Sequence, residues 1–82
     1  MNKSNKFKRD PYEPLVVLIR GTMAVRGETT ERISAKIQVT PPTLFSRLRN
    51  PHDFKLYELQ RLSKVLDIPW CDIISIIPEK SY

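Results

Sequence analysis

Few side chains in this 82-residue sequence have the types and spacing that catalysis or metal binding requires. His52 is the only histidine and Cys71 the only cysteine, and no carboxylates stand at ligand spacing beside them. Gly21 and Gly27 are the only glycines, which leaves no glycine-rich nucleophile or phosphate loop. The nine acidic residues are scattered, without an obvious catalytic pair. The sequence therefore predicts no enzyme, no metal site and no cofactor.

The groups best suited to binding an anion are concentrated at the N-terminus. Four cations precede the first acid, Asp10, whereas the remaining residues hold ten basic and nine acidic side chains, so most of the net charge of +5 belongs to this segment. Residues 1–10 are expected to form a flexible basic arm. Two interpretations stay open, a solvated tail or an arm that reaches the phosphates or the minor groove of DNA. Its cations are Lys3, Lys6, Lys8 and Arg9.

Residues 29–49 read as two helices joined by a very short turn. In the first helix, Ile33 and Ile37 stand four apart and give one apolar stripe. Thr29 or Thr30 can cap its start, because a threonine hydroxyl accepts a hydrogen bond from a free backbone N–H.

In the second helix, Leu44 and Leu48 supply the inward stripe. Thr40 is a good N-cap, and Pro41 fits the first helical position, where its missing N–H is tolerated. The connection is only residues 38–40, so the second helix must turn sharply against the first. The pattern predicts a helix-turn-helix.

Three further helices are expected around this pair. One runs from Leu15 to about Arg26 and ends at Gly27, since glycine most readily adopts the left-handed conformation that often follows a helix. A second follows a turn at residues 50–53, and Pro69 can start a last helix that ends before Pro78. Their expected apolar positions are Leu15, Leu18, Ile19, Met23 and Val25, then Leu56, Leu59, Leu62, Val65 and Leu66, then Ile73, Ile74, Ile76 and Ile77.

The expected fold class is therefore all-α, a compact bundle of about five short helices. A single domain should span residues 11–78, because 82 residues bury only a modest core. Residues 79–82 are expected to be a C-terminal tail.

This ordered set of features resembles the helix-turn-helix DNA-binding domains of the Cro and lambda-repressor-like (Xre-type) regulators of bacteria and phages. The sequence departs from the family pattern at Ser34, at Gln38, where the turn usually has glycine, and at Pro41 and Pro42, which replace polar residues. The matching residues are Thr29, Ile33, Ile37, Val39, Thr40, Asn50, Pro51, Leu56, Leu59, Leu62, Val65, Leu66 and Ile68.

The resemblance implies a repressor-like transcriptional regulator whose helix over residues 41–49 enters the major groove of a double-stranded DNA operator. Helical geometry adds that Pro42, Thr43, Ser46, Arg49 and Asn50 point outward if Leu44 and Leu48 point inward, with Arg47 on the flank and Phe45 more consistent with the core. The expected base-reading residues are Pro41, Pro42, Thr43, Ser46, Arg47 and Arg49. The expected phosphate-binding residues are Thr29, Thr30, Thr40 and Asn50, together with the arm cations Lys3, Lys6, Lys8 and Arg9.

Five large apolar side chains near the C-terminus raise the question of a partner. One helix face can pack inward, but an exposed apolar patch usually marks an interface, so a homodimer is expected. The alternative is that all five are buried within one chain. The residues assigned to this interface are Trp70, Ile73, Ile74, Ile76 and Ile77.

Two features of the sequence bear on the cellular location of the protein. The longest apolar run behind the basic start, residues 15–19, is too short for a secretory signal or a membrane span. A single cysteine cannot form an internal disulfide, so nothing in the sequence calls for an oxidising compartment. Together these features predict a cytoplasmic protein without a membrane partner. A second functional class stays open, a protein-interaction module that binds another regulator or a polymerase subunit.

Overall fold

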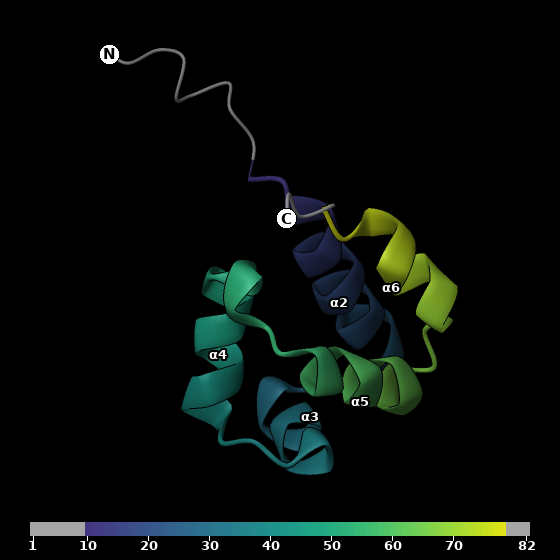
Figure 1. Cartoon of the computed structure of the whole chain (residues 1–82). Helices are drawn as coiled ribbons and strands as arrows, with labels where there is room; N and C mark the ends of the chain where they lie inside the picture. The colour runs from purple at the N-terminus through teal and green to yellow at the C-terminus, as the bar shows by residue number, and fades with distance from the viewer. Residues whose placement is uncertain (1–9, 79–82) are drawn as a thin grey trace.

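Five α-helices and one short 3-10 helix follow one another in the computed structural model, which describes residues 10–78 (Figure 1). That range contains no strand, and the prediction of an all-α bundle of five short helices is confirmed. The basic arm cations and the tail at 79–82 lie outside the described residues. The elements are α2 (Glu13–Arg26), α3 (Thr30–Ile37), α4 (Pro41–Arg49), η1 (Pro51–Asp53), α5 (Leu56–Leu66) and α6 (Trp70–Ile76).

Residues with positive φ end three of the helices. Gly27 ends α2 as predicted, with φ 68°, and Gln38 (φ 67°) and Asp67 (φ 57°) end α3 and α5 in the same way. Only glycine adopts this region without a steric penalty, because other residues bring Cβ close to the backbone. The two non-glycine positions therefore carry backbone strain, which is smaller for the short polar side chain of Asp67.

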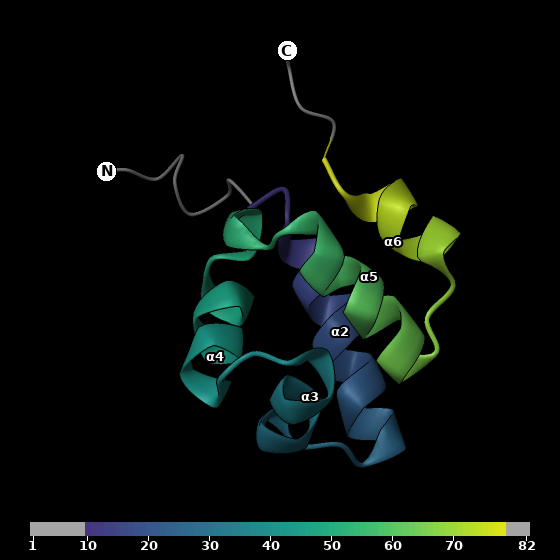
Figure 2. The same cartoon turned by 60° about the horizontal axis from the view of Figure 1, so that its bottom comes forward.

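The central element is α5, which packs against α2, α3 and α6 (Figure 1). In both overall views, α3 and α4 lie on one side of the bundle and α6 on the other (Figure 2). Each fully buried aliphatic side chain in the core contributes roughly 1.5–3 kcal/mol. The core residues are Leu15, Ile19, Met23, Ile33, Ile37, Leu44, Leu48, Leu59, Leu62, Leu66, Ile68 and Ile73.

Two positions expected on apolar stripes are exposed instead. Val25 is 88% exposed because it lies two residues beyond Met23, about 200° around the helix from that buried side chain. Leu56 is 60% exposed at the first position of α5, whereas Leu59, Leu62 and Leu66 face the core. The apolar stripes of α2 and α5 are therefore shorter than predicted.

The last helix packs most of its apolar side chains, fully or in part, against the core of the same chain. Ile73 has no exposed surface, so its assignment to a dimer interface is corrected: it belongs to the core. Trp70, Ile76 and Ile77 are partly buried against that core, and Ile74 is the one that stays largely exposed. No helix within residues 10–78 is both long enough and apolar enough to cross a membrane.

Candidate nucleic-acid interface

The turn between α3 and α4 closes the end of α3 and sends the chain in a new direction. The N–H of Gln38 donates to the carbonyl of Ala35 at 3.2 Å, and the N–H of Val39 donates to that of Ser34 at 3.0 Å. This pairing is the Schellman type of helix end, which requires the left-handed residue found at Gln38. The turn is as short as predicted, and α4 begins at Pro41.

Ser34 lies in the middle of α3, the helix that packs against both α4 and α5. It is fully buried, and its hydroxyl donates to the carbonyl of Glu31 at 2.9 Å. The polar atom is thus satisfied within its own helix, so the position behaves as a small packing residue. A serine here is compatible with close packing of the helix pair.

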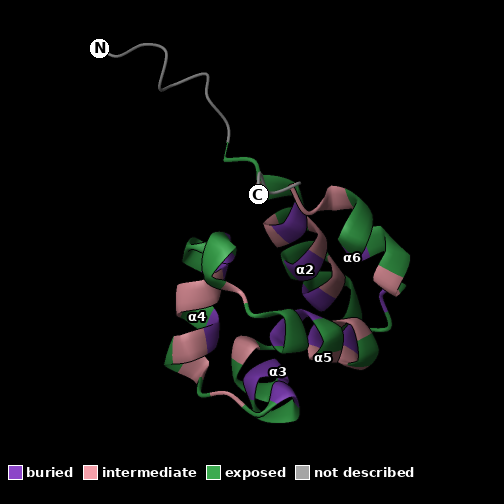
Figure 3. Cartoon of the chain, viewed as in Figure 1, coloured by how far each residue is buried: buried purple, intermediate pink, exposed green. Residues whose placement is uncertain are grey.

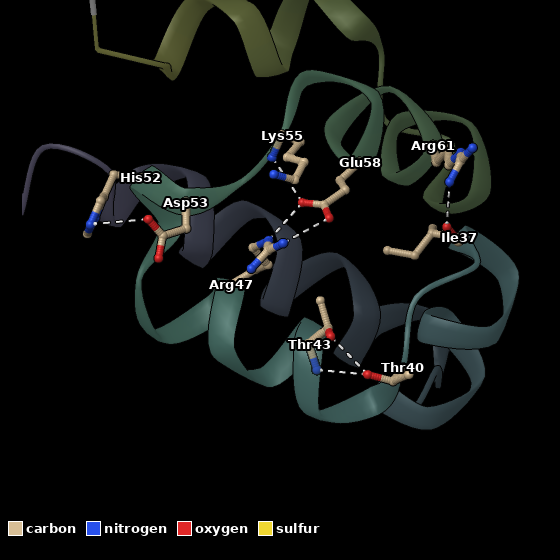
Figure 4. A network of polar contacts seen from close by, with 9 residues as sticks. All are labelled: Ile37, Thr40, Thr43, Arg47, His52, Asp53, Lys55, Glu58 and Arg61. Carbon is tan, nitrogen blue, oxygen red and sulfur yellow. Dashed lines mark hydrogen bonds and ion pairs between the residues drawn. The ribbon is translucent and has the colours of Figure 1, made fainter.

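Thr40 caps α4 as predicted. Its Oγ1 accepts from the N–H of Thr43 at 3.3 Å and lies 2.9 Å from the Thr43 hydroxyl (Figure 4). Pro41 and Pro42, the first two residues of the helix, have no N–H. From the cap Thr40 to Thr43, only the N–H of Thr40 has no hydrogen bond among the described residues, whereas a helix start ordinarily offers several such groups.

The hydroxyls of Thr40 and Thr43 are hydrogen-bond donors at a helix start where Pro41 and Pro42 have no N–H. One hydroxyl proton joins Thr40 and Thr43, whichever of the two is the donor. The other hydroxyl proton then has no acceptor among the described residues and is available to a ligand. An anion at the start of α4 would therefore interact with a threonine hydroxyl and with the positive end of the helix dipole, and with few backbone N–H groups.

The start of α3 is built differently. Thr29 caps it, accepting from the N–H of Arg32 at 3.1 Å. The N–H groups of Thr29, Thr30 and Glu31 have no hydrogen bond among the described residues. This helix start therefore has the free donors that suit an anion, although the carboxylate of Glu31 lies in the same turn.

Arg47 joins α4 to α5. Its Nε donates to Oε1 of Glu58 at 2.9 Å and its NH2 group donates to Oε2 at 3.3 Å, the two-pronged geometry that guanidinium and carboxylate favour (Figure 4). Glu58 is only 2% exposed and also accepts from the N–H of Lys55 at 2.9 Å, so it caps the start of α5 as well. One carboxylate thus holds two helices.

The charges of this pair stabilise one another. Burial acts to raise the pKa of Glu58, but hydrogen bonds from Arg47 and from the Lys55 N–H outweigh it, and the pKa lies below its ordinary value. The hydrogen bond to Glu58 in turn raises the pKa of Arg47. Both groups are charged at neutral pH, as an ion pair with little solvent around the carboxylate.

Arg61 joins α5 to the end of α3. Its NH1 group donates to the carbonyl of Ile37 at 3.1 Å, at the negative end of the α3 dipole (Figure 4). The guanidinium also lies 4.8 Å from the centre of the Tyr57 ring, within the range of a cation–π interaction. Arg61 and the Arg47–Glu58 pair therefore attach both α3 and α4 to the same helix.

The outer side of α4 remains open. Leu44 and Leu48 are buried, and the positions turned away from the bundle are exposed or half-buried (Figure 3). Pro42 and Arg49 are exposed, in agreement with the prediction that they point outward, and Phe45 is 42% exposed instead of belonging to the core. The residues of the predicted set that are half-buried are Pro41, Thr43, Ser46 and Arg47.

Beyond α4, Asn50 is exposed, with its N–H held by the carbonyl of Ser46 at 2.9 Å. His52 and Asp53 follow in η1, both more than half exposed, with 3.6 Å between Nε2 and Oδ1. Within residues 10–78, no three histidine, cysteine or acidic side chains gather where they could hold a metal ion. Asn50, His52 and Asp53 are therefore exposed residues that follow α4 directly.

Reasoning from the sequence missed the Glu58 pair and the exposure of Phe45. A glutamate three residues after the cap of a helix is a known capping signal, which could have identified the hydrogen bond from the Lys55 N–H to Glu58.

Comparison with protein-family models, with curated proteins and with solved structures finds no match for this chain.

Proposed function

We propose that the protein is a sequence-specific double-stranded DNA-binding regulator of transcription, of the repressor-like type found in phages and mobile elements, that acts in the cytoplasm. In this proposal, α4 enters the major groove and the starts of α3 and α4 face the phosphates. No cofactor and no catalytic step is involved.

The observation that carries the proposal is the open outer face of α4 on a helix held firmly from behind. Arg47 and Arg61 attach the α3–turn–α4 unit to α5, so the exposed side of α4 is presented by a fixed support. Arg49, exposed and without an ion pair among the described residues, is the group best placed to pair with guanine. A helix of this width fits the major groove of B-form DNA.

Selection of bound duplexes from a random pool tests this function. Once a site is found, Arg49→Ala should weaken binding to it by about 1–3 kcal/mol and relax the preference at one base pair. Arg20→Ala is the charge-matched control, because Arg20 is exposed on α2, outside the helix pair proposed to meet DNA and outside the proposed dimer surface. Recovery of no duplex at low salt would reject the proposal, and equal losses for both variants on every sequence would reject base reading by Arg49.

The phosphate contacts have a separate signature. Each phosphate neutralised adds about 0.9 to the slope of log affinity against log salt, so deletion of the basic arm should flatten that slope by about one to three units if the arm binds DNA. An unchanged slope would favour the solvated tail.

We also propose that the regulator binds as a homodimer through the exposed side of α6. Ile74 is 49% exposed, and Trp70 is only partly covered. A two-fold arrangement would bring two recognition helices into successive major grooves about 34 Å apart. Sedimentation of the wild type and of Ile74→Glu decides this point, since a wild type that is monomeric alone and on DNA would reject it.

A specific observation also favours the alternative of a protein-interaction module. Val17 and Val25 are largely exposed on α2, away from the side that packs in the core. A pull-down with Val17→Glu and Val25→Glu, compared with the DNA selection, separates the two functions. Loss of a protein partner together with unchanged DNA recovery would assign this surface to protein binding.

A further inference from the structure

The outer strip of α4 has an unusual chemical character for a surface that reads bases. Pro42 and Phe45 stand three residues apart and are both exposed, and Arg49 follows four residues later on the same side. Pro42 and Phe45 have no side-chain donor or acceptor. Two of these three exposed side chains are therefore unable to read DNA by hydrogen bonds.

Packing within the protein does not account for Phe45. Leu44 and Leu48 already fill the core side of α4, with 0% and 3% exposure. Arg47, two residues after Phe45 and so about 200° around the helix, is fixed to Glu58. With Leu44 and Leu48 buried and Arg47 held by Glu58, this rotation of α4 leaves the phenyl ring outside the core.

The major groove offers one apolar feature to such a strip, the methyl group on C5 of thymine. A cytosine methylated at C5 presents the same group at the equivalent position. We propose that Phe45, assisted by Pro42, reads the C5-methyl group of a pyrimidine in the major groove. This inference depends on the proposed DNA binding and specifies which base feature α4 recognises.

The test removes the C5-methyl group from one thymine at a time and leaves the base pairing unchanged. In the selected site, each thymine is replaced in turn by deoxyuridine, and affinity is measured by titration at fixed salt. At the position that Phe45 contacts, wild-type binding should weaken about fourfold, the change that corresponds to roughly 0.8 kcal/mol for one methyl group. In Phe45→Gln, thymine and uracil sites should bind equally.

Two further variants guard against effects on folding. Phe45→Leu keeps an apolar side chain and should retain part of the preference for thymine. Val25→Ala removes an exposed apolar side chain from α2 and should leave the full preference intact. All variants are compared at equal folded fraction, measured by circular dichroism.

The possible outcomes are distinct. If a specific site is selected but uracil replaces thymine everywhere without loss, or if Phe45→Gln keeps the fourfold preference, the inference is overturned while DNA binding stands. If no duplex is selected at all, the proposed function itself fails. Replacing cytosine by 5-methylcytosine identifies the source of the group: a gain in affinity assigns recognition to both methylated bases, and no gain assigns it to thymine.

Discussion

The two flanks of α4 use arginine in opposite ways. On the inner flank, Arg47 donates two hydrogen bonds to a buried carboxylate and is only 20% exposed. On the outer side, Arg49 is exposed and has no ion pair among the described residues. Two arginines separated by one residue therefore differ in their contacts: Arg47 holds α4 against α5, whereas Arg49 stays accessible, as the proposed contact with DNA requires. Residue type alone does not distinguish them; their position around the helix does.

The largest expected effect is the loss of the inner contact. Arg47→Ala leaves the carboxylate of Glu58 buried without its partner, which should lower the free energy of unfolding by about 3–5 kcal/mol. Arg49→Ala is the matched control and should change it by no more than about 0.5 kcal/mol. Urea unfolding of both variants measures the difference. Similar losses in the two would remove the contrast between the flanks.

Acid should weaken the inner flank selectively. The pKa of Glu58 is below its ordinary value of 4.5 in the folded protein, so the ion pair contributes fully above about pH 4.5. This contribution is lost as the pH falls through the lower pKa of the folded state.

The variant Glu58→Gln keeps the side-chain shape without the charge. Its unfolding free energy should therefore fall less steeply than that of the wild type below pH 4.5. Thermal melts across this range check the difference in slope. Parallel pH profiles would show that another carboxylate causes the acid sensitivity.

The attachment of α3 to α5 by Arg61 should contribute less to the free energy of unfolding than the Arg47–Glu58 pair does. Arg61→Ala removes a hydrogen bond to the Ile37 carbonyl and the contact with the Tyr57 ring. Because this arginine is half-buried, a loss of about 1–2 kcal/mol in unfolding free energy is expected. A variant at Lys64, which is exposed on the same helix, provides the comparison by urea unfolding. A larger loss than for Arg47→Ala would reverse the assigned order of the two attachments.

The smallest expected effect lies at the turn before α4. Gln38→Gly relieves the positive φ and should raise the free energy of unfolding by about 0.5–1 kcal/mol. Asp67→Gly at the end of α5 should gain less, since aspartate tolerates the left-handed region better than glutamine. Thermal melts of the two variants test this order. A loss at Gln38 would mean that its side chain has a stabilising contact.

Local signals in the sequence predicted the fold well. The features that sequence reasoning missed depend on contacts between residues far apart in the chain. Threonine caps, proline starts and leucine steps are encoded within one turn of each helix, so the helix bounds were close. Arg47 and Glu58 stand eleven residues apart on different helices, and no local pattern joins them. The exposure of Phe45 depends on how α4 is rotated against its neighbours, which the contacts of Leu44, Leu48 and Arg47 determine together.

The attachment of α3 and α4 to a common helix has a thermodynamic consequence. If both stay fixed to α5, binding a ligand should order few additional protein groups, and the conformational entropy lost on association should be small. The change in heat capacity on binding should then follow from the contact surface alone, without the additional term that accompanies folding coupled to binding. Arg61→Ala, which loosens α3 while leaving the outer strip of α4 intact, should make that heat-capacity change more negative in calorimetric titrations.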